Sequence, residues 1–90
     1  MATTELTLIG KAGCHLCDDA RDVVTAVLAH PTLMETGRDF ELVEKSILDD
    51  EQLFERYVEE IPVLLIDGKV HNYWRIDPER LLRALHAESR

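Results

Sequence analysis

Two cysteines, Cys14 and Cys17, stand where an apolar run of the chain gives way to an amphipathic segment. The apolar run, residues 6–9, is suited to a central strand, and residues 20–28 repeat apolar side chains at the spacing of one helix face. The Cys-x-x-Cys motif therefore falls at a strand-to-helix turn. Backbone N–H groups at a helix start stabilise a thiolate, and two thiols one turn apart can interconvert with a disulfide. The motif predicts a dithiol redox site.

Length and composition indicate one small domain. Ninety residues, 46% of them hydrophobic, provide a single core, so we expect one domain over residues 1–90. The sequence has neither an apolar run of membrane-spanning length nor a basic and apolar leader, and we expect a cytoplasmic protein. In that compartment a lone cysteine pair is more often catalytic or metal-binding than structural.

The charge balance argues against two classes of partner. The formal net charge is −8, whereas nucleic acids and anionic membranes bind basic surfaces, so we expect neither as a partner. Within residues 35–60, ten acids stand against three basic residues, which gives that segment a net charge of −7. Such a segment is either a solvated surface or a docking face for a basic partner.

The middle of the chain predicts a second strand and a second helix. Residues 40–43 have a strand pattern, and the helix before them predicts that this strand runs parallel to the first. A capping-box pattern, with Asp49 as the N-cap and Gln52 at the third helical position, predicts the start of the next helix. The apolar face of that helix is expected to bury Leu53, Phe54, Tyr57 and Val58.

The last third of the chain predicts a hairpin and a closing helix. Residues 63–66 form a continuous apolar strand, and the Asp-Gly pair at 67–68 predicts a tight turn into residues 69–73. Asp77 followed by proline predicts the start of a final helix. Leu81, Leu82 and Leu85 of this helix are expected to face the core. The predicted element order is β-α-β-α-β-β-α.

Together these features resemble a known fold family. The cysteine motif, Ile61-Pro62 before the third strand, and the closing hairpin and helix are similar to a thioredoxin-fold protein of glutaredoxin size. The resemblance spans nearly the whole chain and is most similar to short glutaredoxin-like proteins. It implies an α/β thioredoxin-like fold, in which helices flank a four-stranded mixed sheet. It also implies a thiol–disulfide oxidoreductase or electron carrier.

The resemblance assigns roles to three residues. Cys14 matches the nucleophile that attacks a substrate disulfide, and Cys17 matches the thiol that resolves the mixed disulfide, so the two would form a redox-active disulfide. Pro62 matches the family's cis-proline, which would hold the Ile61 backbone extended for pairing with a substrate chain. We expect a monomer that reduces protein disulfides and is itself reduced by an upstream reductase or thiol. No cofactor is expected.

Four other side chains are candidates for substrate binding. Lys11 matches a basic position ahead of the glutaredoxin motif, where it would stabilise a thiolate or bind a substrate carboxylate; a plain solvated lysine is the alternative. Protonated His15 would favour a neighbouring thiolate, unless it is simply an exposed residue. Trp74 either packs at the core or rim with its N–H hydrogen-bonded, or forms an apolar wall of the substrate groove. Arg75 would offset nearby negative charge.

Residues 73–77 depart from the glutaredoxin pattern. Glutaredoxins use a Gly-Gly pair and a nearby Asp there to let glutathione approach the backbone, whereas this chain has bulky side chains and only Asp77 fits. Glu59 and Glu60 add negative charge near the predicted site, which disfavours a tripeptide with two carboxylates. Arg75 compensates in part. Glutathione is therefore an alternative reductant that these residues disfavour.

Two other classes of function are compatible with the sequence. One is a metal site that uses the cysteines with His15, although the other histidines, His30, His71 and His86, are scattered and form no second ligand pair. The other is a non-catalytic interaction module whose acidic segment docks a basic partner. Stoichiometric zinc would favour the first, and unchanged biological activity after Cys14→Ser would favour the second.

Overall fold

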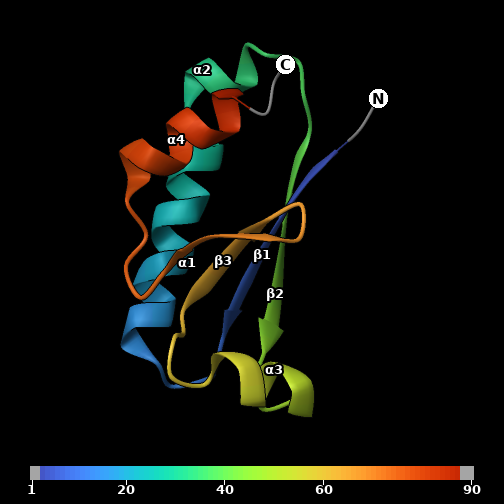
Figure 1. Ribbon diagram of the computed structural model, residues 1–90. Coiled ribbons are helices and arrows are strands. Elements are labelled where there is room, and N and C mark those ends of the chain that lie inside the picture. Colours follow the sequence, from blue (N-terminus) through green and yellow to red (C-terminus); the bar gives the residue numbers. More distant parts are fainter. Residues whose placement is uncertain (1–2, 88–90) are drawn as a thin grey trace.

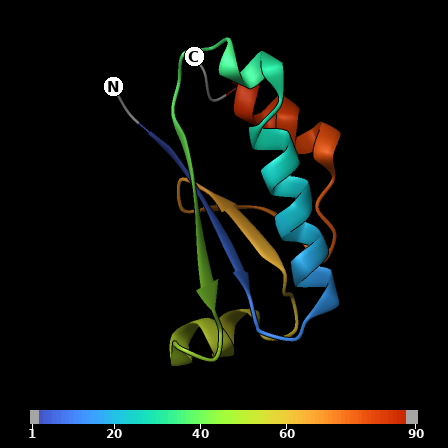
Figure 2. The ribbon, with the colours of Figure 1, turned by 180° about the vertical axis from the view of Figure 1, so that it is seen from behind.

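A four-stranded sheet with the strand order β2-β1-β3-β4 forms the centre of the computed structural model, which describes residues 3–87 (Figure 1). In chain order the elements are β1 (Thr4–Gly10), α1 (His15–Leu28), α2 (Pro31–Met34), β2 (Phe40–Ser46), α3 (Glu51–Tyr57), β3 (Val63–Ile66), β4 (Lys69–Tyr73) and α4 (Pro78–Ala87). Helices α1, α2 and α4 lie together on one side of the sheet, and α3 lies beyond the ends of β1 and β2 (Figures 1 and 2). The predicted α/β thioredoxin-like architecture is confirmed, with α2 as an additional short helix.

The connections between strands determine their directions. The helical crossover through α1 leaves β1 and β2 parallel, with Gly10 opposite Ser46. The strand β3 is antiparallel to both β1 and β4. Asp67 and Gly68 in the turn before β4 have φ values of 48° and 85°, the left-handed conformation that a two-residue hairpin turn requires. The hairpin predicted from this residue pair is therefore present.

Each face of the sheet has its own core cluster. Because side chains alternate along a strand, Leu6 and Leu8 of β1 face the larger cluster, whereas Ile9 faces the smaller one. The larger cluster includes buried residues of α1, α2 and α4, and the smaller one includes Tyr57 of α3. The central strand β1 is thus covered on both sides, as its apolar sequence predicts.

Helix α1 presents its predicted apolar stripe to the core. Ala20, Val24 and Val27 are buried, and Val23 and Leu28 are partly buried against them. The helix ends at Leu28, and Pro31 then occupies the first turn of α2. Among the described residues, no helix is long and apolar enough to cross a membrane.

Two predictions about α3 are wrong. Asp50, not Asp49, is the N-cap: its Oδ1 accepts hydrogen bonds from Gln52 N at 2.9 Å and Leu53 N at 3.3 Å. The N–H of Asp49 instead donates to the Ser46 carbonyl in the turn after β2, which delays the helix by one residue.

The second error concerns the buried face of α3. Phe54 and Val58 are exposed, whereas Tyr57 is buried and Leu53 is partly buried against the same cluster. A helix of seven residues presents one narrow face to the sheet, and the i, i+4 pair Leu53 and Tyr57 occupies it. The neighbouring pair, Phe54 and Val58, is therefore left in contact with solvent.

Candidate functional site

The strand register brings the predicted site residues to one edge of the sheet. Ile9 lies opposite Val63, and Val63 lies opposite Tyr73. The loop after β1, residues 11–14, therefore emerges at the same edge as residues 61–62 before β3 and the segment after β4. The sequence elements that predicted a redox site converge there.

Cys14 is the N-cap residue of α1. Its backbone is extended, and its Sγ accepts a hydrogen bond from Cys17 N at 3.2 Å. Its carbonyl oxygen accepts from Asp18 N at 3.1 Å, which closes the first helical turn. The side chain remains partly exposed. Cys14 thus combines access from solvent with a hydrogen bond from the helix start, as the motif predicted.

Cys17 lies beneath Cys14, and its side chain is only 3% exposed. Burial, with a smaller contribution from the neighbouring Cys14 sulfur, raises the pKa of the Cys17 thiol to about 11, while a backbone hydrogen bond from Lys11 opposes the shift. Both cysteines are free thiols in this structure. The pair therefore consists of an accessible sulfur at the helix start and a buried sulfur that retains its proton at neutral pH.

The peptide bond between Ile61 and Pro62 is cis, and Pro62 is buried. The N–H of Ile61 donates to the Tyr57 carbonyl at 3.1 Å, and the carbonyl of Pro62 accepts from Trp74 N at 2.8 Å. The Ile61 amide is thus already engaged within the protein. Pairing of a substrate chain with Ile61 would rely on its carbonyl oxygen, or would require the bond to Tyr57 to open.

Trp74 has an unusual backbone conformation for a large residue. Its φ is 67°, and Arg75 N donates to the Tyr73 carbonyl at 2.9 Å across it, which makes Trp74 the central residue of a γ-turn. Such a conformation costs a bulky residue on the order of 1–3 kcal/mol and persists only where the surroundings fix it. The fixing contacts here are Trp74 N to Pro62 and Trp74 Nε1 to the Glu59 carbonyl at 3.1 Å.

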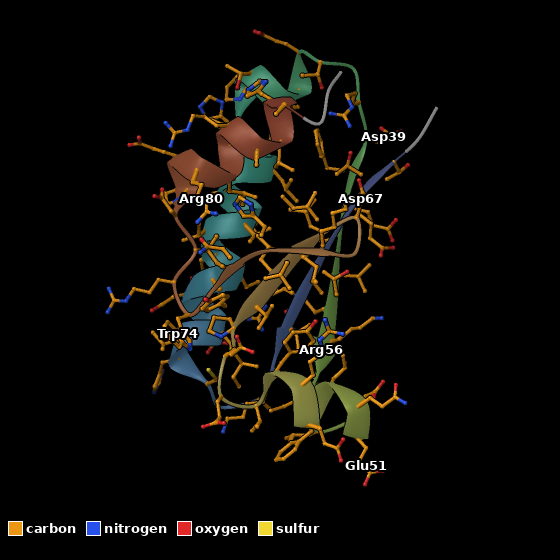
Figure 3. The ribbon with its side chains drawn as sticks, viewed as in Figure 1. Asp39, Glu51, Arg56, Asp67, Trp74 and Arg80 are labelled. Atoms are coloured by element: carbon orange, nitrogen blue, oxygen red, sulfur yellow. The ribbon has the colours of Figure 1, made fainter. Side chains whose placement is uncertain are left out.

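These contacts leave the indole of Trp74 at the surface. It is 54% exposed and lies beside the first turns of α1 (Figure 3). The ring of Tyr73 meets it edge-on, with 5.0 Å between ring centroids. The indole N–H is hydrogen-bonded at the rim, as the first alternative predicted, and the ring lines a surface hollow; a wall of a substrate groove stays a prediction.

That hollow has a volume of about 230 Å³ and lies between α1 and the segment after β4. We call it the apolar hollow; its lining residues are Leu16, Asp19, Ala20, Val23, Trp74, Arg75 and Ile76. Leu16 contributes from inside the cysteine motif and is 43% exposed. One of the residues that line the hollow is therefore only two positions after Cys14 in the sequence.

A second hollow, of about 300 Å³, lies between α1 and the carboxyl ends of β1 and β2. Lys11, Cys17 and Lys45 are among its lining residues. Arg21, also in the lining, forms ion pairs with Glu44 and, at 3.3 Å, with Asp18. We call it the charged hollow. Cys17 thus lines a different hollow from the one that Leu16 and Trp74 form.

Three of the predicted substrate-binding residues line these two hollows, and His15, Ile61 and Pro62 line neither. Trp74 and Arg75 lie together at the apolar hollow, whereas Lys11 lines the charged hollow. His15 is the first residue of α1 and is exposed. Within residues 3–87, no group of three or more His, Cys, Asp or Glu side chains is arranged to hold a metal ion.

Two residues of the site were not predicted. Gly10 lies against Cys17, and Leu16 forms part of the apolar hollow. Gly10 stands at the end of a buried strand, shortly before the cysteine motif. A glycine in such a place often marks a point where another group lies close to the backbone, and this signal would have identified Gly10. The exposure of Leu16 follows from the helix orientation, which the sequence does not specify.

Comparisons with known proteins show the family and the fold of this chain. Residues 5–86 match the family described as glutaredoxin-like domain (DUF836). An uncharacterised protein of Mycobacterium tuberculosis strain H37Rv is 25% identical over 84 residues, which cover 90% of this chain and 81% of that protein. The X-ray structure of target protein XcR50 from X. campestris is similar with a TM-score of 0.68 and 31% identity, over 91% of this chain and 96% of that one.

Two further solved structures share the fold. The solution structure of protein Ne2328 from Nitrosomonas europaea has a TM-score of 0.64 at 22% identity and covers 93% of each chain. The crystal structure of Trxlp from Edwardsiella tarda EIB202 has a TM-score of 0.58 at 15% identity, over 91% of this chain and 81% of that one.

Proposed function

This chain belongs to the glutaredoxin-like domain (DUF836) family, and we propose that it reduces protein disulfides by dithiol exchange through Cys14 and Cys17. The observation that carries the proposal is the arrangement of the two thiols. Cys14 is a partly exposed sulfur that accepts a hydrogen bond from the helix start, and Cys17 is a buried sulfur one turn away. This division suits an attacking thiol and a resolving thiol.

In the first step, the Cys14 thiolate attacks one sulfur of the substrate disulfide. A bond forms between Cys14 and that sulfur, the substrate disulfide bond breaks, and the other substrate sulfur leaves as a thiolate that takes up a proton. The product is a mixed disulfide between Cys14 and the substrate. Only the accessible sulfur of the pair takes part in this step.

In the second step, Cys17 gives up its proton and attacks the Cys14 sulfur. The bond between Cys14 and the substrate breaks, and the substrate leaves as its second thiol. The protein is oxidised by two electrons to the Cys14–Cys17 disulfide, and the substrate is reduced by two electrons. A thiol reductant or an upstream reductase returns the pair to the dithiol form, as the reducing cytosol expected from the sequence would favour.

The surroundings of the site favour a protein substrate over glutathione. The indole of Trp74 occupies the segment where glutaredoxins place glycines, and its hydrogen bonds hold it there. Glu59 and Glu60 precede the cis-proline, and their charge opposes the two carboxylates of glutathione. Arg75, at the rim of the apolar hollow, offsets only part of that charge.

The test is to trap the mixed disulfide. A Cys17→Ser variant, incubated with a lysate of the source cells oxidised by diamide, should accumulate thiol-sensitive adducts that mass spectrometry maps to Cys14. The matched control, Cys14→Ser, should form few adducts because its remaining thiol is buried. Absence of any Cys14-dependent adduct with protein or glutathione would overturn the proposed exchange.

A further inference from the structure

We propose that the apolar hollow is a specificity pocket that binds a large apolar side chain next to the reactive cysteine of a basic substrate polypeptide. This inference rests on the proposed function, because it names the kind of substrate that the same site takes. It concerns residues on one side of α1 that the exchange reaction itself does not require.

The walls of the hollow have the properties of a pocket for a side chain. Leu16, Val23 and Ile76 supply aliphatic surface, and the indole of Trp74 supplies a flat aromatic wall. Trp74 and Leu16 are 54% and 43% exposed, although burial of such large apolar side chains is favourable in free energy. A volume of about 230 Å³ is on the order of one large side chain. An exposed aromatic anchor beside aliphatic surface is typical of a binding site.

The position of Trp74 is fixed before any substrate arrives. Its backbone N–H is bonded to Pro62 and its indole N–H to Glu59, both in the segment before β3. The ring therefore loses little conformational freedom when a ligand packs on it, which favours binding. The left-handed backbone of Trp74 thus carries a bulky side chain in the segment where the resemblance to glutaredoxins implies glycine.

One wall of the hollow belongs to the turn of α1 that follows the reactive cysteine. Leu16 lies in the first turn of α1, two residues after Cys14. An extended peptide advances about 3.3 Å per residue, so a cysteine bonded to Cys14 brings its neighbouring residues over the same turn. On this basis we assign the hollow to the side chain adjacent to the substrate cysteine.

Charge around the hollow selects the flanking residues of the substrate. Asp19 and Arg75 lie in its lining, whereas the neighbouring Asp18 lines the charged hollow and pairs with Arg21. Glu59 is exposed on the segment that holds Trp74, and Glu60 follows it. Asp19, Glu59 and Glu60 thus outnumber Arg75 around the hollow, and a substrate with basic residues beside its cysteine complements them. Glutathione has no apolar side chain, and its two carboxylates outweigh its one ammonium group.

The experiment uses three blocked peptides, each bonded through its cysteine to 2-mercaptoethanol. The sequences are Lys-Cys-Phe-Lys, Lys-Cys-Ser-Lys and Glu-Cys-Phe-Glu, and the readout is the second-order rate constant with the reduced full chain. We expect the first peptide to react about tenfold faster than the second, the scale on which enzymes discriminate by one apolar group. The third should react several-fold more slowly than the first, with the difference shrinking at high salt.

Variants of Trp74 test whether the preference for the Phe peptide arises at the apolar hollow. Trp74→Ala should bring the Phe-to-Ser ratio close to one, and Trp74→Phe should restore most of it, because the wall is apolar surface and not the N–H. The control is Val70→Ala, which removes another exposed apolar side chain of the hairpin and should leave the ratio unchanged.

A second measurement does not depend on a substitution at Trp74. Trp74 is the single tryptophan of the chain, so fluorescence reports on the hollow alone. In the Cys17→Ser variant, a trapped Phe peptide should shift the emission to shorter wavelength, and a trapped Ser peptide should not. Equal emission in both adducts, or equal rate constants for the two Lys peptides, would overturn the pocket.

Failure of the pocket is distinguishable from failure of the proposed function. Hydroxyethyl disulfide presents no side chain to the hollow, so its reaction with Cys14 tests exchange alone. Reaction with this probe but no preference among peptides would refute the pocket only. No Cys14-dependent reaction with any of these disulfides would refute the exchange chemistry, and the pocket with it.

Discussion

The sulfur of Cys17 occupies the space that a side chain at position 10 would need. A Cβ added to Gly10 would lie 2.8 Å from Cys17 Sγ and 3.0 Å from its Cβ. The backbone of Gly10 has little freedom to move away, because its carbonyl accepts from Ile47 N at 2.9 Å and the residue pairs with Ser46 in the sheet. Gly10 is therefore a positioning residue for the thiol that is proposed to resolve the mixed disulfide.

Gly10→Ala should slow the second chemical step without slowing the first. Displacement of the Cys17 sulfur by the added methyl group lengthens or misaligns its approach to Cys14, and a small misplacement of reacting atoms costs about tenfold or more in rate. Attack of Cys14 on hydroxyethyl disulfide releases one 2-mercaptoethanol and leaves the other bonded to Cys14, and we expect this mixed disulfide to accumulate in the variant. Quenched-flow mass spectrometry measures its formation and decay separately.

Gly68→Ala is the control for this experiment. Gly68 has a φ of 85° in the β3–β4 turn and nothing within 4 Å of an added Cβ, so alanine there introduces backbone strain away from the cysteines. Both variants should be less stable than the wild type. If Gly10→Ala resolves the mixed disulfide as fast as Gly68→Ala does, Gly10 has no role beyond packing.

The raised pKa of Cys17 predicts how its reactivity depends on pH. A thiol with a pKa of about 11 is roughly one-thousandth thiolate at pH 8. In a Cys14→Ser variant, burial still raises the pKa of Cys17, although the contribution of the Cys14 sulfur is gone. We expect the rate of iodoacetamide labelling to be still rising at pH 10. A plateau at or below pH 9 would contradict the assigned burial.

The same shift makes the stability of the reduced protein depend on pH. The unfolded chain releases the Cys17 proton near pH 9, whereas the folded protein retains it up to about pH 11. The contribution of this thiol to stability is thus fully present below pH 9 and is lost as the pH rises toward 11. Urea unfolding of the wild type and of Cys17→Ala should show their difference in stability shrinking over that window. A constant difference would refute the shift.

The cysteine motif could be predicted because it has a local physical cause. The Cys-x-x-Cys motif predicted a thiol at the helix start, because the motif lies between an apolar strand and a helical repeat. The prediction that Ile61 and Pro62 belong to the same site depends on the family resemblance and not on local physics. The bond before Pro62 is cis, as the resemblance implied.

The remaining features depend on tertiary contacts that leave no periodic signal. The γ-turn at Trp74 is disfavoured for a bulky residue, and only the hydrogen bonds to Pro62 and Glu59 establish it. The division of Lys11 and Arg75 between two hollows follows from their attachment to different strands of the sheet. The positions of Lys11 and Arg75 in the sequence, relative to the cysteines, do not reveal that the two side chains line different hollows.

The partly buried side chain of His71 in β4 should make the folded protein less stable in acid. Its Nε2 is buried without a hydrogen-bond partner among the described residues, and burial, with repulsion from Arg80, lowers its pKa despite the opposing charge of Asp77. As the pH falls below 6.5, the unfolded chain takes up the proton before the folded protein does, so stability decreases. In His71→Leu, denaturant unfolding at pH 7.5 and pH 5 should show a smaller loss than in the wild type.

NMR titration of the histidine ring provides the direct check of that shift. His71 should titrate below pH 6.5 in the wild type, and Arg80→Gln should raise its pKa only in part, because burial is the larger cause. Titration of His71 at or above pH 6.5 in the wild type would show that the ring is solvated.

The neighbouring acids Asp49 and Asp50 should differ sharply in their effect on stability. Asp50 Oδ1 accepts two backbone hydrogen bonds at the start of α3, whereas the described contact of Asp49 at this turn is made by its backbone N–H. Asp50→Ala should therefore lower the free energy of unfolding by about 1 kcal/mol, and Asp50→Asn should recover most of it. Asp49→Ala removes the same charge one residue earlier without removing a cap, so we expect a change within about 0.5 kcal/mol. Equal losses from the two alanine variants in urea unfolding would mean that charge, and not capping, determines the contribution of Asp50.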